Sequence, residues 1–351
     1  MLFKRPRIGI IVLLVLIVIF ALFKISRFSD PQTTLSKNNT RFELTTDNPF
    51  GVMIGAPLGM SLNTKMQAAK QLGVTYYRPT TAIFLDKWNG TCKECAAASR
   101  NGLRLILTIR NGGGHGNPST PPKDEKAYLQ QVSEILDTHK PEVLVVENEE
   151  NSMELFYTGT PQEYHRELKI ACDLAHSKNS KCTNGGLVSS LVIGLVYDNY
   201  IQNGQLQKAE QFLDKALTSE KLTEFKSQQT KVEMQLTRGT GLLTGYKSAG
   251  ADYVNFHWYS DSPEALAEAK VYIEQVTGLP AISNEIGQQK NVDPNQVTSL
   301  MNKVVELKIP IAVWYSVDTL THGQAKSLTD LNGTLRENGI AFQEFIQKNF
   351  N

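Results

Sequence analysis

The sequence has almost no net charge. Its 36 Lys and Arg residues balance 35 Asp and Glu residues, which gives a formal net charge of +1. It also contains no long acidic or basic block. Proteins that bind nucleic acids or other polyanions usually concentrate positive charge on one face or in one segment. The balanced charge therefore argues against nucleic acid as a partner and favours an uncharged ligand.

Motifs for phosphate and metal cofactors are also missing. The stretch 51–56 supplies no G-x-G-x-x-G, and the glycines at 112–116 are not followed by Gly-Lys-Ser/Thr. Cys92 and Cys95 form one C-x-x-C, whereas a zinc ribbon needs a second such pair. The six histidines do not form a ligand cluster with aspartates in the sequence. We therefore expect neither a cofactor nor a metal.

Cysteine is scarce, with four residues in 351. Four cysteines allow three disulfide pairings, and their spacing does not choose among them. An oxidising compartment would favour disulfides. A bond between Cys172 and Cys182, which would tie a helix to the next strand, is one of the open pairings.

The N-terminal segment differs in composition from the rest of the chain. Basic residues precede sixteen apolar or glycine residues, Ile8 to Phe23. This run is slightly longer than the core of a signal peptide and slightly shorter than the ~20 residues of a usual membrane span. No small-x-small cleavage site follows it, so residues 1–28 are expected to be an uncleaved transmembrane signal anchor, with a cleaved signal peptide as the alternative.

Positive charge before the apolar run favours an N-terminus inside the cell and a domain outside the cytoplasm. Residues 29–46 are polar and are expected to be a linker. Residues 47–351 are long enough for one large α/β barrel domain.

That domain alternates short apolar runs with helical patterns, which is typical of repeated βα units around a parallel sheet. Eight strands followed by helices in about 300 residues predict a (β/α)8 TIM barrel, with a doubly wound open sheet as the alternative. The long connection after the fifth strand, from Val188 to about Thr237, is expected to add one or two helices beside the C-terminal ends of the strands. The predicted strands are Phe50–Gly55, Val74–Arg78, Leu103–Ile109, Val143–Asn148, Cys182–Leu187, Tyr253–His257, Ala281–Asn284 and Ile311–Tyr315.

Acidic residues and amides stand at the ends of two of these strands. The fourth strand runs into Glu147-Asn148-Glu149-Glu150-Asn151, and the seventh runs into Asn284-Glu285-Ile286-Gly287. Parallel α/β barrels hold their chemistry at the C-terminal ends of the strands. A pair of carboxylates there suits acid/base and nucleophilic work on a glycosidic bond, although a polar strand-to-loop transition would look similar.

These residues resemble the retaining clan A glycoside hydrolases, (β/α)8 barrels such as families 5 and 39. Asn148-Glu149-Glu150-Asn151 matches the clan's Asn-Glu-Pro-Asn at three of four positions, with Glu150 in place of proline. The resemblance covers the barrel and implies that Glu149 is the acid/base and Glu285 the nucleophile. Asn148 would hold the 2-hydroxyl of the sugar, an interaction that strengthens in the transition state.

Four further substrate-binding candidates match clan positions. His257 and Tyr259 follow the sixth strand on one face, and the resemblance implies that Tyr259 hydrogen-bonds the nucleophile. Trp314 on the eighth strand matches a sugar-stacking platform, and Arg78 at the end of the second strand matches an arginine near the nucleophile. Each has a competing interpretation: barrel or core packing for His257, Tyr259 and Trp314, and a buried ion pair, with Glu147 as the suggested partner, for Arg78.

Two residues near the site are harder to assign. His115 lies in the glycine-rich loop after the third strand and is a candidate contact with substrate. Glu147 would share a strand face with Glu149, but the Asn-Glu order favours Glu149 as the acid/base.

The sequence therefore predicts a membrane-anchored retaining β-glycosidase that acts outside the cytoplasm on an oligosaccharide or polysaccharide. A transglycosidase and a non-catalytic glycan-binding barrel are the alternatives. An inverting or metal-assisted hydrolase would need carboxylates further apart or a ligand cluster.

Overall fold

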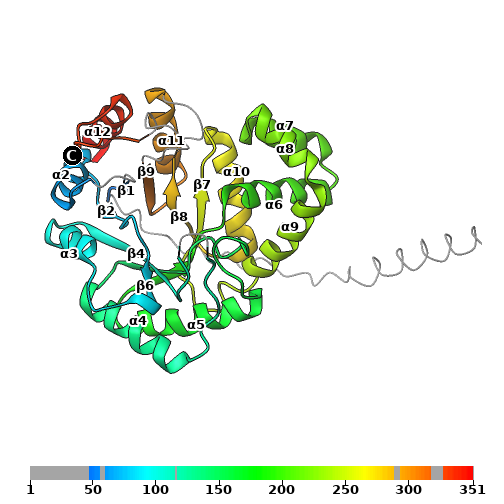
Figure 1. Cartoon of the computed structure of the whole chain (residues 1–351). Helices are drawn as coiled ribbons and strands as arrows, with labels where there is room; N and C mark the ends of the chain where they lie inside the picture. The colour runs from blue at the N-terminus through cyan, green and yellow to red at the C-terminus, as the bar shows by residue number, and fades with distance from the viewer. Residues whose placement is uncertain (1–46, 56–59, 115–116, 288–292, 318–326, 351) are drawn as a thin grey trace, which may run out of the picture. The chain divides into compact units, whose positions relative to one another are not determined.

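Eight parallel strands form a closed barrel in the computed structural model, which describes residues 47–55, 60–114, 117–287, 293–317 and 327–350 (Figure 1). The strands pair in the order β6-β5-β4-β2-β1-β9-β8-β7, and a parallel bridge between Thr183 and Tyr253 joins the two ends. The predicted (β/α)8 barrel is confirmed. Its strands are β1 (Phe50–Gly55), β2 (Tyr76–Tyr77), β4 (Arg104–Arg110), β5 (Val143–Val146), β6 (Lys181–Asn184), β7 (Val254–Trp258), β8 (Ala281–Ile286) and β9 (Ala312–Val317).

A short additional strand, β3 (Ile83–Phe84), pairs with β4 outside the barrel path and is followed by the 3-10 turn η1 (Leu85–Lys87). Every predicted barrel strand overlaps an observed one. Because β3 interrupts the numbering, the fourth, sixth, seventh and eighth barrel strands are β5, β7, β8 and β9.

Two apolar layers hold the barrel together. Side chains at alternate strand positions fill the interior, among them Met53, Ile106 and Val145. The other positions face the helices, as Phe50 does where its ring meets the edges of Phe342 and Phe345 on α12. This two-sided burial explains why the strands are apolar runs without polar alternation.

Helices cover the outside of the barrel (Figure 1). Their start signals are local: Thr160 caps α5 in a capping box with Glu163 and precedes Pro161, and Ser262 caps α10 before Pro263. The start of α5 was predicted at the same residue. The outer helices are α2 (Leu62–Leu72), α3 (Lys93–Arg100), α4 (Glu125–His139), α5 (Pro161–Ser177), α10 (Pro263–Thr277), α11 (Pro294–Glu306) and α12 (Glu337–Phe350).

The connection between β6 and β7 contains four helices, α6 (Ser189–Gln202), α7 (Leu206–Ala216), α8 (Ser219–Ser227) and α9 (Gln229–Leu243). They gather on one side of the barrel in Figure 1. The predicted helical insertion after the fifth strand is thus present, and it is larger than the one or two helices expected.

Two disulfides are formed, Cys92–Cys95 and Cys172–Cys182. The second joins α5 to β6 and is the pairing that was named above among the open ones. The predicted signal anchor (1–28), the linker (29–46) and His115 lie outside the described residues. Within the described ranges, no helix is both long and apolar enough to cross a membrane.

Candidate active site

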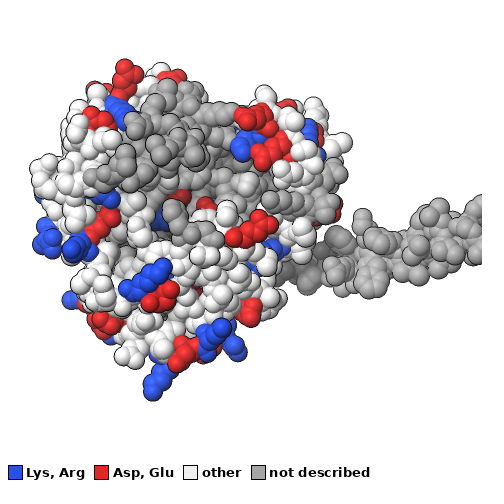
Figure 2. Space-filling model, viewed as in Figure 1, with Lys and Arg blue, Asp and Glu red and all other residues white. Residues whose placement is uncertain are grey.

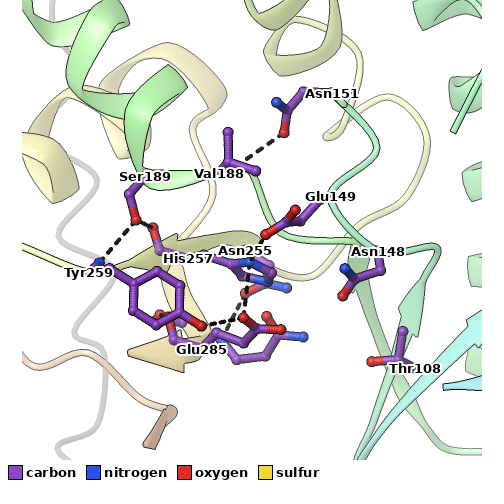
Figure 3. Close-up of polar contacts among 12 residues, drawn as sticks. Thr108, Asn148, Glu149, Asn151, Val188, Ser189, Asn255, His257, Tyr259 and Glu285 are labelled. Atoms are coloured by element: carbon purple, nitrogen blue, oxygen red, sulfur yellow. Dashed lines mark hydrogen bonds and ion pairs between the residues drawn. The ribbon is translucent and has the colours of Figure 1, made fainter. Parts of the chain in front are cut away.

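The side chains of Glu149 and Glu285 meet at the C-terminal ends of β5 and β8 (Figure 3). Glu285 lies on β8 itself, whereas Glu149 follows β5 in a turn. Glu147 and Glu149 both have left-handed backbone conformations, with φ of 66° and 45°. Such conformations are costly for residues other than glycine and tend to persist where a functional side chain is being aimed. Here they stop the strand and turn Glu149 toward Glu285.

His257 on β7 lies between the two carboxylates. Its Nδ1 is 2.8 Å from Oε1 of Glu149 and 3.4 Å from Oε2 of Glu285. One oxygen of each carboxylate and a ring nitrogen of His257 all lie within 4.8 Å of one another. The two acids therefore share one small site, as the strand ends predicted.

Glu285 is held as an anion by its neighbours. Its Oε1 forms an ion pair with Arg78, and its Oε2 accepts a hydrogen bond from the hydroxyl of Tyr259. Burial raises the pKa of Glu285, but the charges of His257 and Arg78 and these hydrogen bonds lower it more, to about 2. Glu285 is thus ionised at any pH well above 2, which is the state that a nucleophile requires.

Besides Glu285, Arg78 contacts Thr108 on β4 and Asn148, which follows β5. Its second terminal nitrogen donates to Oδ1 of Asn148 at 2.8 Å, and its Nε donates to Thr108 at 3.3 Å. Arg78 does form a buried ion pair, as the competing interpretation had it, but its partner is Glu285 and not the suggested Glu147. Arg78 and Asn148 are therefore both beside the two glutamates.

His257 is fully buried, and the backbone is shaped around its ring. A Cβ on Gly186 would lie 2.4 Å from Nε2 of His257, so only glycine fits at that position. Burial lowers the pKa of His257, but the charge of Glu285 and the contact with Glu149 outweigh it and raise the pKa above the ordinary value. A protonated ring donates to Glu149 through Nδ1. Ser189 at the start of α6 steadies this strand end, since its hydroxyl donates to the carbonyl of His257.

Glu149, His257 and Glu285 are also residue types that bind metals. Arg78 and Tyr259 already occupy the two oxygens of Glu285, however, and the guanidinium charge would repel a cation. The arrangement therefore fits proton transfer and nucleophilic attack better than metal binding.

Glu147 does not enter the site, although it stands only two residues before Glu149. It is fully buried and accepts from the backbone N–H of Asn111 at 2.7 Å and from the hydroxyl of Ser119, with Arg110 3.6 Å away. Burial raises its pKa to about 7 despite these partners. The expected shared face is wrong, because the left-handed turn at Glu147 rotates its side chain away from that of Glu149.

Glu147→Gln is expected to make the free energy of unfolding less dependent on pH. The pKa of Glu147 is about 7 in the folded chain and near 4.5 when unfolded, so the folded state holds more protons between these values. The contribution of Glu147 to the free energy of unfolding is therefore largest below about pH 4.5. It falls as pH rises toward 7, by an amount on the order of 1–3 kcal/mol. Denaturant titrations at pH 5 and pH 7.5 give the change in the free energy of unfolding between the two pH values. The same change in Glu147→Gln as in the wild type would contradict the raised pKa of Glu147.

Glu150 stands where the clan's motif has proline. Its side chain also points away from those of Glu149 and Glu285. It is fully buried, and its Oε1 accepts from Tyr246 and, at 2.9 Å, from Nδ2 of Asn184. Arg238 of α9 donates to the Glu150 carbonyl at 2.7 Å. The inserted helices thus support the turn that carries Glu149.

Trp314 is not placed as a sugar platform. It is 1% exposed and packs edge-on against Phe342 of α12, in the layer between strands and helices. The next residue, Tyr315, faces the barrel interior with Val313 and meets the ring of Tyr259 at 5.5 Å. Tyr315 is therefore the aromatic residue of β9 on the inner face. Counting alternate positions along β9 from Val313 would have found Tyr315.

Figure 2 shows a hollow near the middle of the face of the domain that it views. A few acidic and basic side chains are visible inside the hollow. Of the predicted site residues, the structure brings together Glu149, Glu285, Arg78, Asn148, His257 and Tyr259.

The chain matches no family model and no curated protein. Solved structures do resemble it. A glucosidase from Croceicoccus marinus aligns with a TM-score of 0.57 and 13% identity over 86% of this chain and 67% of that chain. The GH39 enzyme from Xanthomonas axonopodis pv. citri aligns with a TM-score of 0.54 and 13% identity, over 84% and 65% of the two chains. A GH128 endo-β-1,3-glucanase from Sorangium cellulosum gives 0.53 and 13%, over 84% and 97%.

At such low identity the likeness shows a shared fold. Glycoside hydrolases, one of them from family 39, thus have the barrel that the sequence resemblance implied.

Proposed function

We propose that this protein is a retaining β-glycosidase that acts on a glycan. The observation that carries the proposal is the approach of the two carboxylates, with an oxygen of Glu149 and an oxygen of Glu285 within 4.8 Å. Carboxyl groups of retaining enzymes lie about 5–5.5 Å apart, whereas inverting enzymes leave about 6.5–9.5 Å for a water molecule. The short separation favours attack by a carboxylate over attack by water. The glycoside hydrolases that share the fold add support.

In the first step Glu285 attacks the anomeric carbon while Glu149 donates a proton to the leaving oxygen. The glycosidic bond breaks, and a covalent glycosyl ester forms on Glu285. Arg78 and Tyr259 prepare this step because they keep Glu285 ionised and fix its orientation. Asn148, whose side chain contacts Arg78, would bind the 2-hydroxyl.

In the second step Glu149, now a carboxylate, takes a proton from water as the water attacks the anomeric carbon from the opposite side, and the ester bond breaks to release Glu285 as a carboxylate. Two inversions give net retention. His257 can serve both steps, because a ring that donates to Glu149 stabilises its ionised form after the first proton transfer. An acceptor sugar in place of water would make the same site a transglycosidase.

A panel of aryl β-glycosides assayed with the purified full-length chain tests the proposal. Proton NMR of the first sugar released identifies its anomeric configuration before it equilibrates. A β-product from a β-substrate supports retention, and an α-product contradicts it. Binding of glycans without turnover of any substrate would favour the glycan-binding barrel, and transfer to added sugar acceptors would favour the transglycosidase.

We further propose that residues 1–28 anchor the domain to a membrane, with residues 29–46 as the linker, and that the domain lies outside the cytoplasm. The support is the apolar run from Ile8 to Phe23 without a cleavage site after it. Full-length protein is expected to stay with membranes through a carbonate wash, and a protease added outside the cell should remove the barrel. Recovery of a soluble form that begins near residue 27 would show a cleaved signal peptide instead.

A further inference from the structure

The Cys92–Cys95 pair lies at the start of α3, in the helix layer rather than at the strand ends. Cys92 caps the helix, and its Sγ accepts from the backbone N–H of Cys95 at 3.1 Å. Cys95 is fully buried, whereas Cys92 is half-buried and lines a surface pocket of about 380 Å³. One sulfur of the disulfide is therefore open to a reagent that enters this pocket.

His139, at the end of α4, faces the same pocket. Helices α3 and α4 are neighbours in the barrel (Figure 1). His139 is only 9% exposed, yet its Nε2 has no hydrogen-bond partner among the described residues. A ligand atom of His139 and the sulfurs of Cys92 and Cys95 all lie within 4.8 Å of one another. The edge-on ring of Trp88 packs against the imidazole and limits its rotation.

We propose that reduction of the Cys92–Cys95 disulfide creates a binding site for one thiophilic divalent cation such as Zn²⁺. The two thiolates and His139 supply three ligands, and a water molecule from the pocket supplies the fourth. This inference is independent of the glycosidase proposal, because none of its residues belongs to the carboxylate site.

The donor set and its spacing fit this cation. Zn²⁺ binds thiolate sulfur at about 2.3 Å and imidazole nitrogen at about 2.0–2.1 Å, so tetrahedral ligand atoms lie about 3.4–3.8 Å apart. Small movements from the present positions reach that geometry once the sulfurs separate. The helix N-terminus stabilises negative charge on the sulfur of Cys92. Lys93 and Arg100 also line the pocket.

The redox step balances with an ordinary thiol reductant. Two thiol molecules, or one dithiol, give two electrons and two protons to the Cys92–Cys95 bond and become a disulfide themselves. The cation then displaces the two thiol protons into solvent. The other disulfide, Cys172–Cys182, is a built-in comparison, because both of its sulfurs belong to fully buried residues and it has no open side. Mild reductant should therefore open Cys92–Cys95 first.

The test uses the full-length chain, reduced mildly and freed of reductant by gel filtration without oxygen. Thiol counting should give two thiols, with circular dichroism unchanged. Co²⁺ is then titrated as a spectroscopic probe. One equivalent should bind with thiolate-to-cobalt charge-transfer absorption, and Zn²⁺ should remove that absorption. Cobalt at Glu149, His257 and Glu285 could not produce it, because those residues carry no thiolate.

Three variants complete the design. Cys92→Ser and Cys95→Ser each leave one thiolate, so each should weaken Co²⁺ binding and reduce the charge-transfer band. His139→Gln should weaken Co²⁺ binding by more than the roughly 10- to 100-fold lost when a group that only orients a ligand is removed. Any of four results would overturn the proposal: no thiolate band in the reduced chain, the same band in the oxidised chain, undiminished affinity in His139→Gln, or unfolding of the barrel on reduction.

Discussion

Glu285→Ala is expected to lower the turnover of an activated aryl β-glycoside by a factor on the order of 10⁶, the size of effect that accompanies removal of a covalent nucleophile in a serine protease. Among the residues that the structure describes, Glu285 has no substitute in the site, because Glu147 and Glu150 are turned to partners of their own. Steady-state kinetics with a dinitrophenyl glycoside measure the loss. Glycan binding, followed by calorimetry, should survive, because it does not need the nucleophile.

Small anions should restore part of this activity. Alanine leaves room beneath the anomeric carbon, so azide or formate can attack from the side that Glu285 used. Only one displacement then occurs, and the product has inverted configuration. An azide adduct with retained configuration would contradict the role of Glu285, and so would a variant as active as the wild type.

Folding must be controlled in this experiment, because Glu285 is 8% exposed and pairs with the buried Arg78. Removing one partner of a buried ion pair can cost about 3–5 kcal/mol, since the other charge is left without compensation. Glu285→Gln keeps the shape and can still accept a hydrogen bond from Arg78, so it is the matched variant. Loss of activity in both variants, with the melting temperature of the glutamine variant near that of the wild type, assigns the effect to chemistry.

The strand-end acids were predictable because two independent patterns agree on them. Buried parallel strands are continuous apolar runs, so the abrupt change to Glu and Asn marks where β5 and β8 end. Their C-terminal ends meet at one edge of the barrel, which brings Glu149 and Glu285 together without any knowledge of loops. Arg78, His257 and Tyr259 were implied by the resemblance to the clan, and in the structure they contact the two acids.

The errors came from single-residue geometry that such patterns do not contain. Glu147 was expected beside Glu149, but left-handed conformations at both residues replace strand alternation with a turn. Trp314 was chosen by residue type, although side chains along β9 alternate between the outer and inner layers, which places Tyr315 on the inner face.

Glu149→Ala is expected to have effects that depend on the leaving group. A substrate with a poor leaving group needs the proton, so its turnover should fall by about 10²–10⁴-fold. A dinitrophenyl glycoside needs little proton donation in the first step, so formation of the glycosyl ester should be nearly unchanged while its hydrolysis, which needs a base, becomes slow. A burst of dinitrophenol followed by a low steady rate, measured by stopped-flow absorbance, is the expected signature.

Azide separates this role from that of Glu285. In Glu149→Ala it should attack the ester formed on Glu285, without help from a base, and two displacements then give a product of retained configuration. Glu147→Gln is the matched control, because it removes a carboxylate two residues away that faces Ser119 and Asn111 instead of the site, and it should keep the wild-type dependence on leaving group. If Glu147→Gln showed the burst and the azide adduct while Glu149→Ala did not, the acid/base would be Glu147, and the turn that separates the two side chains would have to open before catalysis.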